Sequence, residues 1–292
     1  MSRLDSVSRL LAIAGACALL SACASTVHKP LSDASRNNIS QLEMRVVVLQ
    51  EGPIFSARPP GVAVAAGGGL IPALIDASVQ KSRQESLVSK VHSVLEAVHD
   101  YDFREEYSSN LSTALQNGFP LKVGKMSVVP SSLSREAADA AIAATKNGAG
   151  LLLLISYYEL EPNLSALTIR TSASLWSEGN PQKAYSNHLI FQATSGSLDL
   201  DRNTELWASE NGQRLREQSL LGIRETLKML VLDLGMKEVV EKPNSPSANT
   251  PTEKFSFYMA GLPQQLEGTL LASEPGRALV RDKTGALFSL PR

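Results

Sequence analysis

Leu151-Leu152-Leu153-Leu154-Ile155 is the stretch that decides the fold. Five consecutive large apolar residues predict a strand with both faces buried, and such a strand belongs in the middle of a sheet. Residues 167–175 then alternate cleanly between apolar and polar side chains, so the following strand has one face in water. A turn at residues 161–163 joins the two segments, which predicts an antiparallel pair.

The elements on either side of this pair complete the predicted fold. Strands are expected at residues 44–49, 123–129 and 185–194, and helices at residues 73–117, 134–142 and 204–234. Ile54 and Phe55 can extend the first strand. The order is strand, helix, strand, helix, antiparallel strands and a closing helix. It predicts an α/β (α+β) domain over residues 41–240, with a mixed sheet and flanking helices.

The C-terminal region differs in composition from this domain. Residues 241–252 are polar and Pro-rich, which predicts a linker. Residues 253–292 contain short apolar segments separated by turns, which predicts a small β-meander. About 40 residues rarely fold alone without a metal or disulfide. We therefore expect the meander to pack on the main domain, a second copy or a partner.

The first 22 residues have the three parts of an export signal. Arg3 and Arg9 give a positive start, residues 10–20 are apolar and uncharged, and small residues precede Cys23. The apolar run is shorter than the roughly 20 residues of a membrane-spanning helix. Removal of residues 1–22 is therefore favoured over their retention as a short anchor helix.

Leu20-Ser21-Ala22-Cys23 resembles the lipobox of bacterial lipoproteins. The resemblance implies cleavage between Ala22 and Cys23, a diacylglycerol thioether on Cys23 and acylation, such as a palmitate, of the new amino terminus. An ordinary secretory signal cut after Ala22 is the alternative. Cys17 lies within the signal, so Cys23 is the only cysteine of the mature chain, which can form no internal disulfide.

The predicted location is the outer membrane, with the domain in the periplasm. Ala24, rather than Asp, follows Cys23 and resembles an outer-membrane sorting signal. Residues 23–40 are polar and predict a loose tether that reaches up to about 50 Å from the bilayer. The lipid of that membrane, bound through acylated Cys23, is the first expected partner.

Overall charge argues against nucleic acid as a partner. The full chain has a net charge of −1, and loss of residues 1–22 changes it to −2. Binding to nucleic acid requires clustered Lys and Arg. Apolar residues make up 43% of the chain, enough to bury a core.

A glycine triplet lies within an uncharged stretch at residues 61–75. Three interpretations remain open: a loop leading into a helix, a segment for membrane contact or self-association, and a phosphate-binding loop. The triplet lacks the Lys-Ser/Thr of a P-loop. The possible membrane or self-association segment comprises Gly67, Gly68, Gly69, Leu70 and Ile71.

Motifs for catalysis and metal binding are weak. His92, Glu96 and His99 share one helical face, as a metal site requires, but polar neighbours favour a solvated face. The chain has no Gly-x-Ser-x-Gly motif, and no cysteine nucleophile is expected once Cys23 is acylated. We therefore expect a non-enzymatic protein without a cofactor or metal.

The order of elements resembles the α/β domains of periplasmic lipoprotein families, such as the curli secretion lipoprotein and the amino-terminal domain of the Tol-system β-propeller protein. The strings at residues 69–77 and 158–167 also resemble those of uncharacterised proteobacterial outer-membrane lipoproteins. Such a family implies no known chemistry, so no functional residue is transferred from it.

Three functions follow from these observations. The first is a non-catalytic lipoprotein that binds an envelope protein during assembly or maintenance of the envelope. The second is an oligomeric secretion pore, in which the strands at residues 168–175 and 185–194 form a membrane hairpin. Aromatic residues make up only 5% of the chain, which weighs against this homo-oligomer. The third is a cell-wall hydrolase, which needs a cleft with two close carboxylates.

Overall fold

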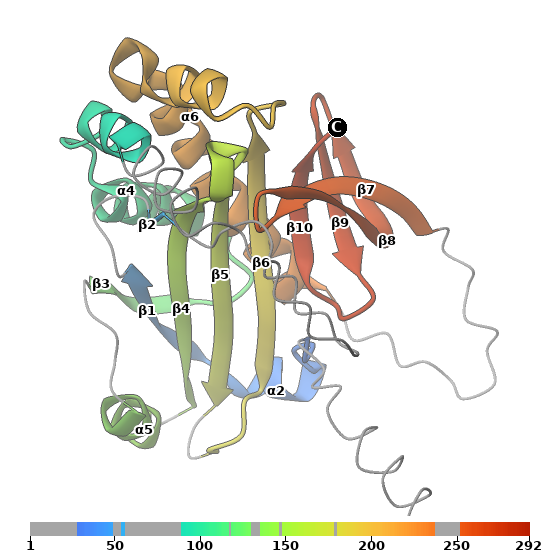
Figure 1. Cartoon of the computed structure of the whole chain (residues 1–292). Coiled ribbons are helices and arrows are strands. Elements are labelled where there is room, and N and C mark those ends of the chain that lie inside the picture. The colour runs from blue at the N-terminus through green and yellow to red at the C-terminus, as the bar shows by residue number, and fades with distance from the viewer. Residues whose placement is uncertain are drawn as a thin grey trace, which may run out of the picture.

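The computed structural model describes residues 28–48, 54–55, 89–116, 118–129, 135–145, 148–177, 180–236 and 252–292. The described chain forms an α+β fold in which helices flank one large mixed sheet, as the sequence predicts (Figure 1). The export signal, the cleavage site at Ala22 and Cys23, and the segment at residues 67–71 lie outside the described residues.

Ten described strands form the sheet, in the order β3-β1-β4-β5-β6-β10-β9-β8-β7, with β2 paired to β4. The strands are β1 (Gln41–Val48), β2 (Ile54–Phe55), β3 (Val123–Val129), β4 (Ala149–Leu160), β5 (Ala166–Ser177), β6 (Tyr185–Thr194), β7 (Thr252–Met259), β8 (Leu262–Glu274), β9 (Arg277–Asp282) and β10 (Leu287–Pro291). The helices are α2 (Asp33–Asn38), α4 (Phe103–Gln116), α5 (Arg135–Ala143), α6 (Leu200–Gly235) and the short 3-10 helix η2 (Pro162–Leu164). Residues 89–97 are also helical.

The predicted central strand is β4. It is parallel to β1 on one side and antiparallel to β5 on the other. Strand β6 is antiparallel to β5 over its whole length, which completes the predicted antiparallel region. Side chains alternate between the two faces, so Leu152 and Leu154 are buried beneath helices whereas Ile155 is 37% exposed on the opposite face.

The C-terminal strands continue the main sheet. β10 pairs in parallel with β6, and β9, β8 and β7 follow in antiparallel order. The predicted meander is therefore joined to the main domain edge to edge, by the pairing of β10 with β6. The side-chain amide of Gln192 imitates a strand, since it donates to the Tyr258 carbonyl oxygen at 2.8 Å and accepts from its N–H at 2.6 Å. These bonds hold β7 against the main sheet.

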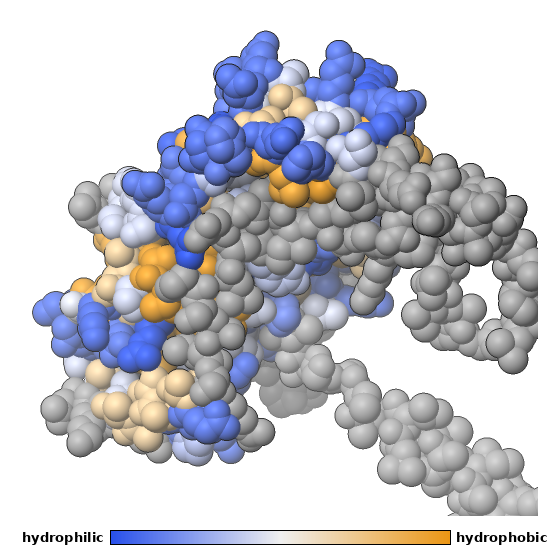
Figure 2. All heavy atoms as spheres, turned by 60° about the vertical axis from the view of Figure 1, so that its left-hand side comes forward, coloured by the Kyte–Doolittle hydropathy of each residue, from blue (hydrophilic) through white to orange (hydrophobic). Residues whose placement is uncertain are grey.

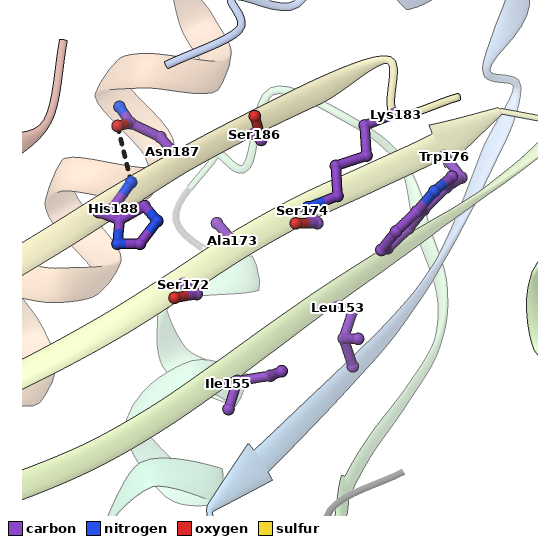
Figure 3. Close-up of a pocket in the computed structure, with 10 residues that line it drawn as sticks. All are labelled: Leu153, Ile155, Ser172, Ala173, Ser174, Trp176, Lys183, Ser186, Asn187 and His188. Atoms are coloured by element: carbon purple, nitrogen blue, oxygen red, sulfur yellow. Dashed lines mark hydrogen bonds between the residues drawn. The ribbon is translucent and has the colours of Figure 1, made fainter. Parts of the chain in front are cut away.

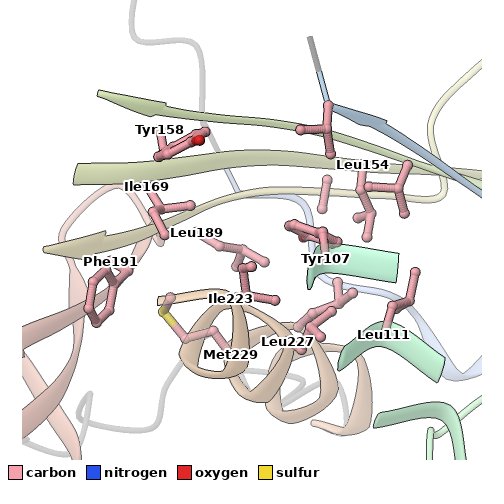
Figure 4. Close-up of a cluster of buried hydrophobic side chains, with 14 of the residues drawn as sticks. Tyr107, Leu111, Leu154, Tyr158, Ile169, Leu189, Phe191, Ile223, Leu227 and Met229 are labelled. Carbon is pink, nitrogen blue, oxygen red and sulfur yellow. The ribbon is translucent and has the colours of Figure 1, made fainter. Parts of the chain in front are cut away.

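Helices α4 and α6 cover one face of the sheet and form the main core with it (Figure 4). Phe103 of α4 stacks on Tyr158 of β4 at a ring separation of 3.8 Å. Tyr107 is also fully buried, where its hydroxyl accepts from Ser156 at 3.2 Å. These aromatic residues anchor α4 in the core.

The predicted helix over residues 73–117 is interrupted. Residues 98–100 form a turn, and α4 begins at Phe103. Asp102 begins this second helix, because its Oδ1 accepts from the N–H of Arg104 at 2.8 Å and from that of Glu105 at 3.4 Å. The periodicity of apolar residues continues through the break, so periodicity alone does not reveal it.

The N-terminal segment differs from the expected loose tether. Residues 28–40 of the predicted 23–40 tether pack against the sheet. Lys29 forms an antiparallel bridge with the start of β6, and Leu31 is 1% exposed. Arg36 donates to the last carbonyl oxygens of α6. Two buried apolar residues, Leu31 and Ile39, therefore fix a segment that its polar composition predicts to be loose.

A buried carboxylate joins this segment to the rest of the fold. Asp233 accepts hydrogen bonds from Tyr185 at 2.9 Å and Asn187 at 2.7 Å, and pairs with Arg281 at 2.6 Å. His28 Nε2 lies 3.4 Å from the same carboxylate. Burial opposes the charge of Asp233, but the hydrogen bonds from His28, Asn187 and Tyr185 outweigh this effect and lower the pKa.

We expect Gly222→Ala to destabilise the fold by about 2 kcal/mol, because overpacking this severe costs about 3 kcal/mol and the helix propensity of alanine offsets about 1. An added Cβ would lie 2.4 Å from Ile169 Cδ1 and 2.6 Å from Phe191 Cδ1. Gly235→Ala is the matched control, since no atom lies within 4 Å of its added Cβ. Urea unfolding measures both, and equal stabilities would contradict close packing of α6.

Asp233→Asn should lower the free energy of unfolding by about 3 kcal/mol at neutral pH, because it removes the charge that Arg281 pairs with. The pKa of Asp233 is below 3.8 in the folded chain. The charge of Asp233 therefore stabilises the fold fully above pH 3.8, and this stabilisation is lost as the pH falls through the folded pKa. The unfolding free energies of the unsubstituted protein and of Asp233→Asn should therefore converge in acid. Asp33→Asn, at an exposed carboxylate, is the control. If the two unfolding free energies still differ at low pH in urea titrations, the difference does not come from the charge of Asp233.

Candidate functional site

The face of β4, β5 and β6 opposite α6 carries a cavity of about 400 Å³ (Figure 3). Its side chains come from alternate positions of the three strands and from the segment that precedes β6. They are Leu153, Ile155, Ser172, Ser174, Trp176, Lys183, Ser186 and His188, and Ala173 and Asn187 complete the lining. The cavity therefore follows from the predicted alternation, which places one face of β5 in water.

Hydrophobic clusters border the cavity on both sides. On the side of β1, Trp176 and Leu153 pack with Val47, and Ile142 of α5 covers this cluster. On the side of β10, the C-terminal strands bury a second cluster that includes Phe288 and contacts Ile190 of β6. The central strip between the clusters remains accessible, as the 37% exposure of Ile155 indicates.

The cavity combines apolar surface with a positive charge. Lys183 Nζ lies 5.6 Å from the ring centre of Trp176, a cation–π arrangement. Burial lowers the pKa of His188, and the charge of Lys183 lowers it further, so this imidazole is neutral at pH 7. The ten lining residues of the described chain include no Asp or Glu. The arrangement favours an apolar group beside a negative charge.

A buried glutamate lies beyond the other end of this face. Glu161 accepts from Thr168 at 3.2 Å, from Arg170 at 3.3 Å and from the N–H of Gly261 at 3.4 Å. Burial raises the pKa of Glu161, against the opposing effect of Arg170. Because all three contacts are internal, Glu161 joins the β7–β8 turn to β5 and has a structural role.

A second hollow of about 460 Å³ lies between the end of α4 and β3 and is lined by Leu115, Phe119, Leu121 and Met126, among others. Figure 2 turns the side of the molecule with α4, β3 and α5 forward, and hydrophobic residues there form small patches among hydrophilic ones. This hollow is more open than the cavity on β5. Its lining has no aromatic residue stacked with a cation, so it is the weaker candidate.

The metal-site motif of the sequence has ordinary helical contacts. His92 Nε2 lies 3.1 Å from Glu96 Oε1, and both side chains are about 70% exposed. His99 Nδ1 instead lies 2.8 Å from the backbone oxygen of Glu96. Within the described ranges, no group of three or more His, Cys, Asp or Glu side chains is placed to hold a metal ion.

Sequence reasoning did not single out Trp176, Lys183 or His188, although a signal for Trp176 exists. This residue shares the parity of Ser172 and Ser174, so the alternation that predicts a polar face of β5 also places one large aromatic side chain on that face. The candidates Ala22, Cys23 and residues 67–71 lie outside the described residues. Among the described helices, none is long and apolar enough to cross a membrane.

The amino-acid sequence matches no protein-family model and no curated protein.

Lys183→Gln should raise the pKa of His188, because it removes the positive charge that disfavours the imidazolium. The imidazole signals of His188, followed by NMR during a pH titration, report this change. Lys125→Gln on the edge strand β3 is the control, since its ammonium belongs to no part of the cavity. An unchanged His188 titration in Lys183→Gln would show that the two side chains do not interact.

Proposed function

We propose that the chain is a lipid-anchored outer-membrane lipoprotein that binds an envelope protein without catalysis, and that the cavity on β4, β5 and β6 is the binding site. The cavity is the observation that carries this proposal. Its volume lies in the range of about 300–1,000 Å³ that is usual for small-molecule pockets, so it has room for a side chain of the partner. The lipobox-like residues that end at Cys23 support the anchor and the periplasmic location.

The lining defines the chemistry of the partner. Trp176, Leu153 and Ile155 offer apolar contact, and three serine hydroxyls can donate and accept hydrogen bonds. Lys183 supplies the positive charge over the Trp176 ring. A partner segment with an apolar side chain next to a carboxylate fits this combination. The site lies in the middle of the sheet, so the partner contacts side chains and adds no strand.

The fold favours this function over the secretion pore. Strands β5 and β6 are interior strands with a hydrogen-bonded neighbour on each side. Ile169, Leu189 and Phe191 of these strands are fully buried in the core that α6 covers. A membrane hairpin would need both strands to leave the sheet and expose this core.

The lining of the cavity favours binding over hydrolysis. Cell-wall hydrolysis by paired carboxylates needs two acidic side chains close to one bond. The residues that line the cavity in the described chain supply hydroxyls, one imidazole and one ammonium. These groups suit recognition of a partner better than that chemistry.

Photo-crosslinking in intact cells tests the proposal. A photoreactive amino acid at Ser174, within the cavity, should form an adduct with a specific envelope protein, whereas one at exposed Ser256 on β7 should not. The adduct should weaken in Cys23→Ser, which cannot be lipidated. Mass spectrometry identifies the partner. Adducts of Ser174 only with the chain itself would instead favour an oligomer.

A negative charge at the open face should reduce the yield of this adduct. Ile155→Glu places a carboxylate beside the apolar lining, and we expect at least about tenfold less adduct, which corresponds to about 1.4 kcal/mol. Leu262→Glu is the matched control, because Leu262 is 46% exposed on β8 and outside the cavity. Equal adduct yields from the two variants would refute the cavity as the binding site.

A further inference from the structure

The first described residues lie very close in the sequence to the predicted lipid anchor. Only residues 24–27 separate Cys23 from His28, which is already in contact with Asp233. Lys29 then exchanges two backbone hydrogen bonds with Ser186 of β6, at 2.8 and 3.0 Å. Five residue steps span at most about 17 Å. The anchor point of the domain is therefore the start of β6, and its distance from the bilayer is short.

Three exposed lysines surround this anchor point. Lys29 lies on the bridge itself, and its ammonium donates to the carbonyl oxygen of Lys183. Lys283 belongs to the β9–β10 turn, whose Gly285 lies directly against His28. The third lysine is Lys183, in the segment before β6. We call Lys29, Lys183 and Lys283 the anchor-side lysines.

The acidic groups near these lysines have internal partners. The carboxylate of Asp282 accepts hydrogen bonds from the Thr284 hydroxyl at 2.8 Å and from the Ala286 N–H at 2.9 Å. Asp33 lies 3.8 Å from Arg36. Asp282 keeps its negative charge, because these partners are neutral, whereas Arg36 offsets the charge of Asp33. The three lysines outweigh Asp282, so this surface is basic on a chain whose net charge is −1. Charge complementarity selects an anionic surface as its partner.

We propose that Lys29, Lys183 and Lys283 hold this end of the sheet against the anionic phospholipid headgroups of the membrane that carries the anchor. The inference rests on the proposed function, since it takes Cys23 as the site of the lipid. A lysine close to an anionic bilayer contributes about fivefold to binding, or about 1 kcal/mol, so three contribute about a hundredfold. Salt at physiological concentration largely screens charges that are more than about 8 Å apart. The short link to Cys23 allows the lysines to come within this distance of the headgroups.

Lysine reactivity on vesicles tests the contact. The mature chain is coupled through Cys23, its only cysteine, to a maleimide phospholipid and reconstituted in vesicles. A water-soluble amine reagent then labels lysines, and mass spectrometry gives the rate at each. Vesicles of phosphatidylethanolamine with phosphatidylglycerol are compared with vesicles of phosphatidylethanolamine with phosphatidylcholine. We expect the anchor-side lysines to react about fivefold more slowly on the anionic vesicles.

Control positions give the experiment its specificity. Lys125 on β3, 70% exposed, and Lys90, which pairs with Asp201 near the other end of α6, should react equally on both kinds of vesicle. In the double variant Lys29→Gln, Lys283→Gln, protection of Lys183 should fall. In the control double variant Lys90→Gln, Lys125→Gln, protection of Lys183 should remain. Equal rates at the anchor-side lysines on both vesicles, or protection on both, would overturn an electrostatic contact.

A separate measurement distinguishes this inference from the proposed function. Mass spectrometry of the protein from its own cells shows whether Cys23 is acylated. An unmodified Cys23 would overturn both the anchored lipoprotein and the native contact that rests on it, whatever the vesicles show. An acylated Cys23 together with unprotected anchor-side lysines would overturn the contact alone and leave the lipoprotein function in place.

Discussion

The close packing of α6 on β5 and β6 determines the rest of the structure. Gly222 brings the helix so near to Ile169 and Phe191 that even a methyl group would overlap them. This contact assigns the odd-numbered side chains of β5 and β6 to the core. Side chains alternate along a strand, so the same contact assigns Ser172, Ser174 and Trp176 to the opposite face. The position of one helix thereby creates the open face that carries the cavity.

A second constraint acts at the C-terminal end of α6. A carboxylate there is unfavourable, because the helix dipole is negative at that end. Asp233 is nevertheless buried, and Arg281 pairs with it while Arg36 donates to the last carbonyl oxygens of the helix. The partners of Asp233 come from the N-terminal segment, β6 and β9. This single charge therefore couples both ends of the described chain to the central sheet.

Local patterns predict most elements of this fold but not their long-range partners. The apolar run at residues 151–155 and the alternation of 167–175 identify β4 and β5 and place β4 between two strands. The parallel pairing of β10 with β6 joins segments about 100 residues apart, and no local pattern specifies it. The same holds for Leu31, a lone apolar residue whose burial depends on distant strands. The cavity follows from parity, whereas the position of Lys183 over Trp176 depends on the turn between two strands.

The proposed partner site and the proposed membrane contact meet at one residue. Lys183 lines the cavity and also belongs to the anchor-side lysines, so anionic lipid and an acidic partner segment compete for its charge. The other residues belong to one surface each. Ser174 and Ile155 line only the cavity, and Lys29 and Lys283 lie only at the anchor point. The cavity extends from Trp176 to the level of Ile155 and His188, about 13 Å along the strands. A partner that occupies it at the membrane must therefore approach along the bilayer surface, with its apolar group directed toward Ile155 and away from the headgroups.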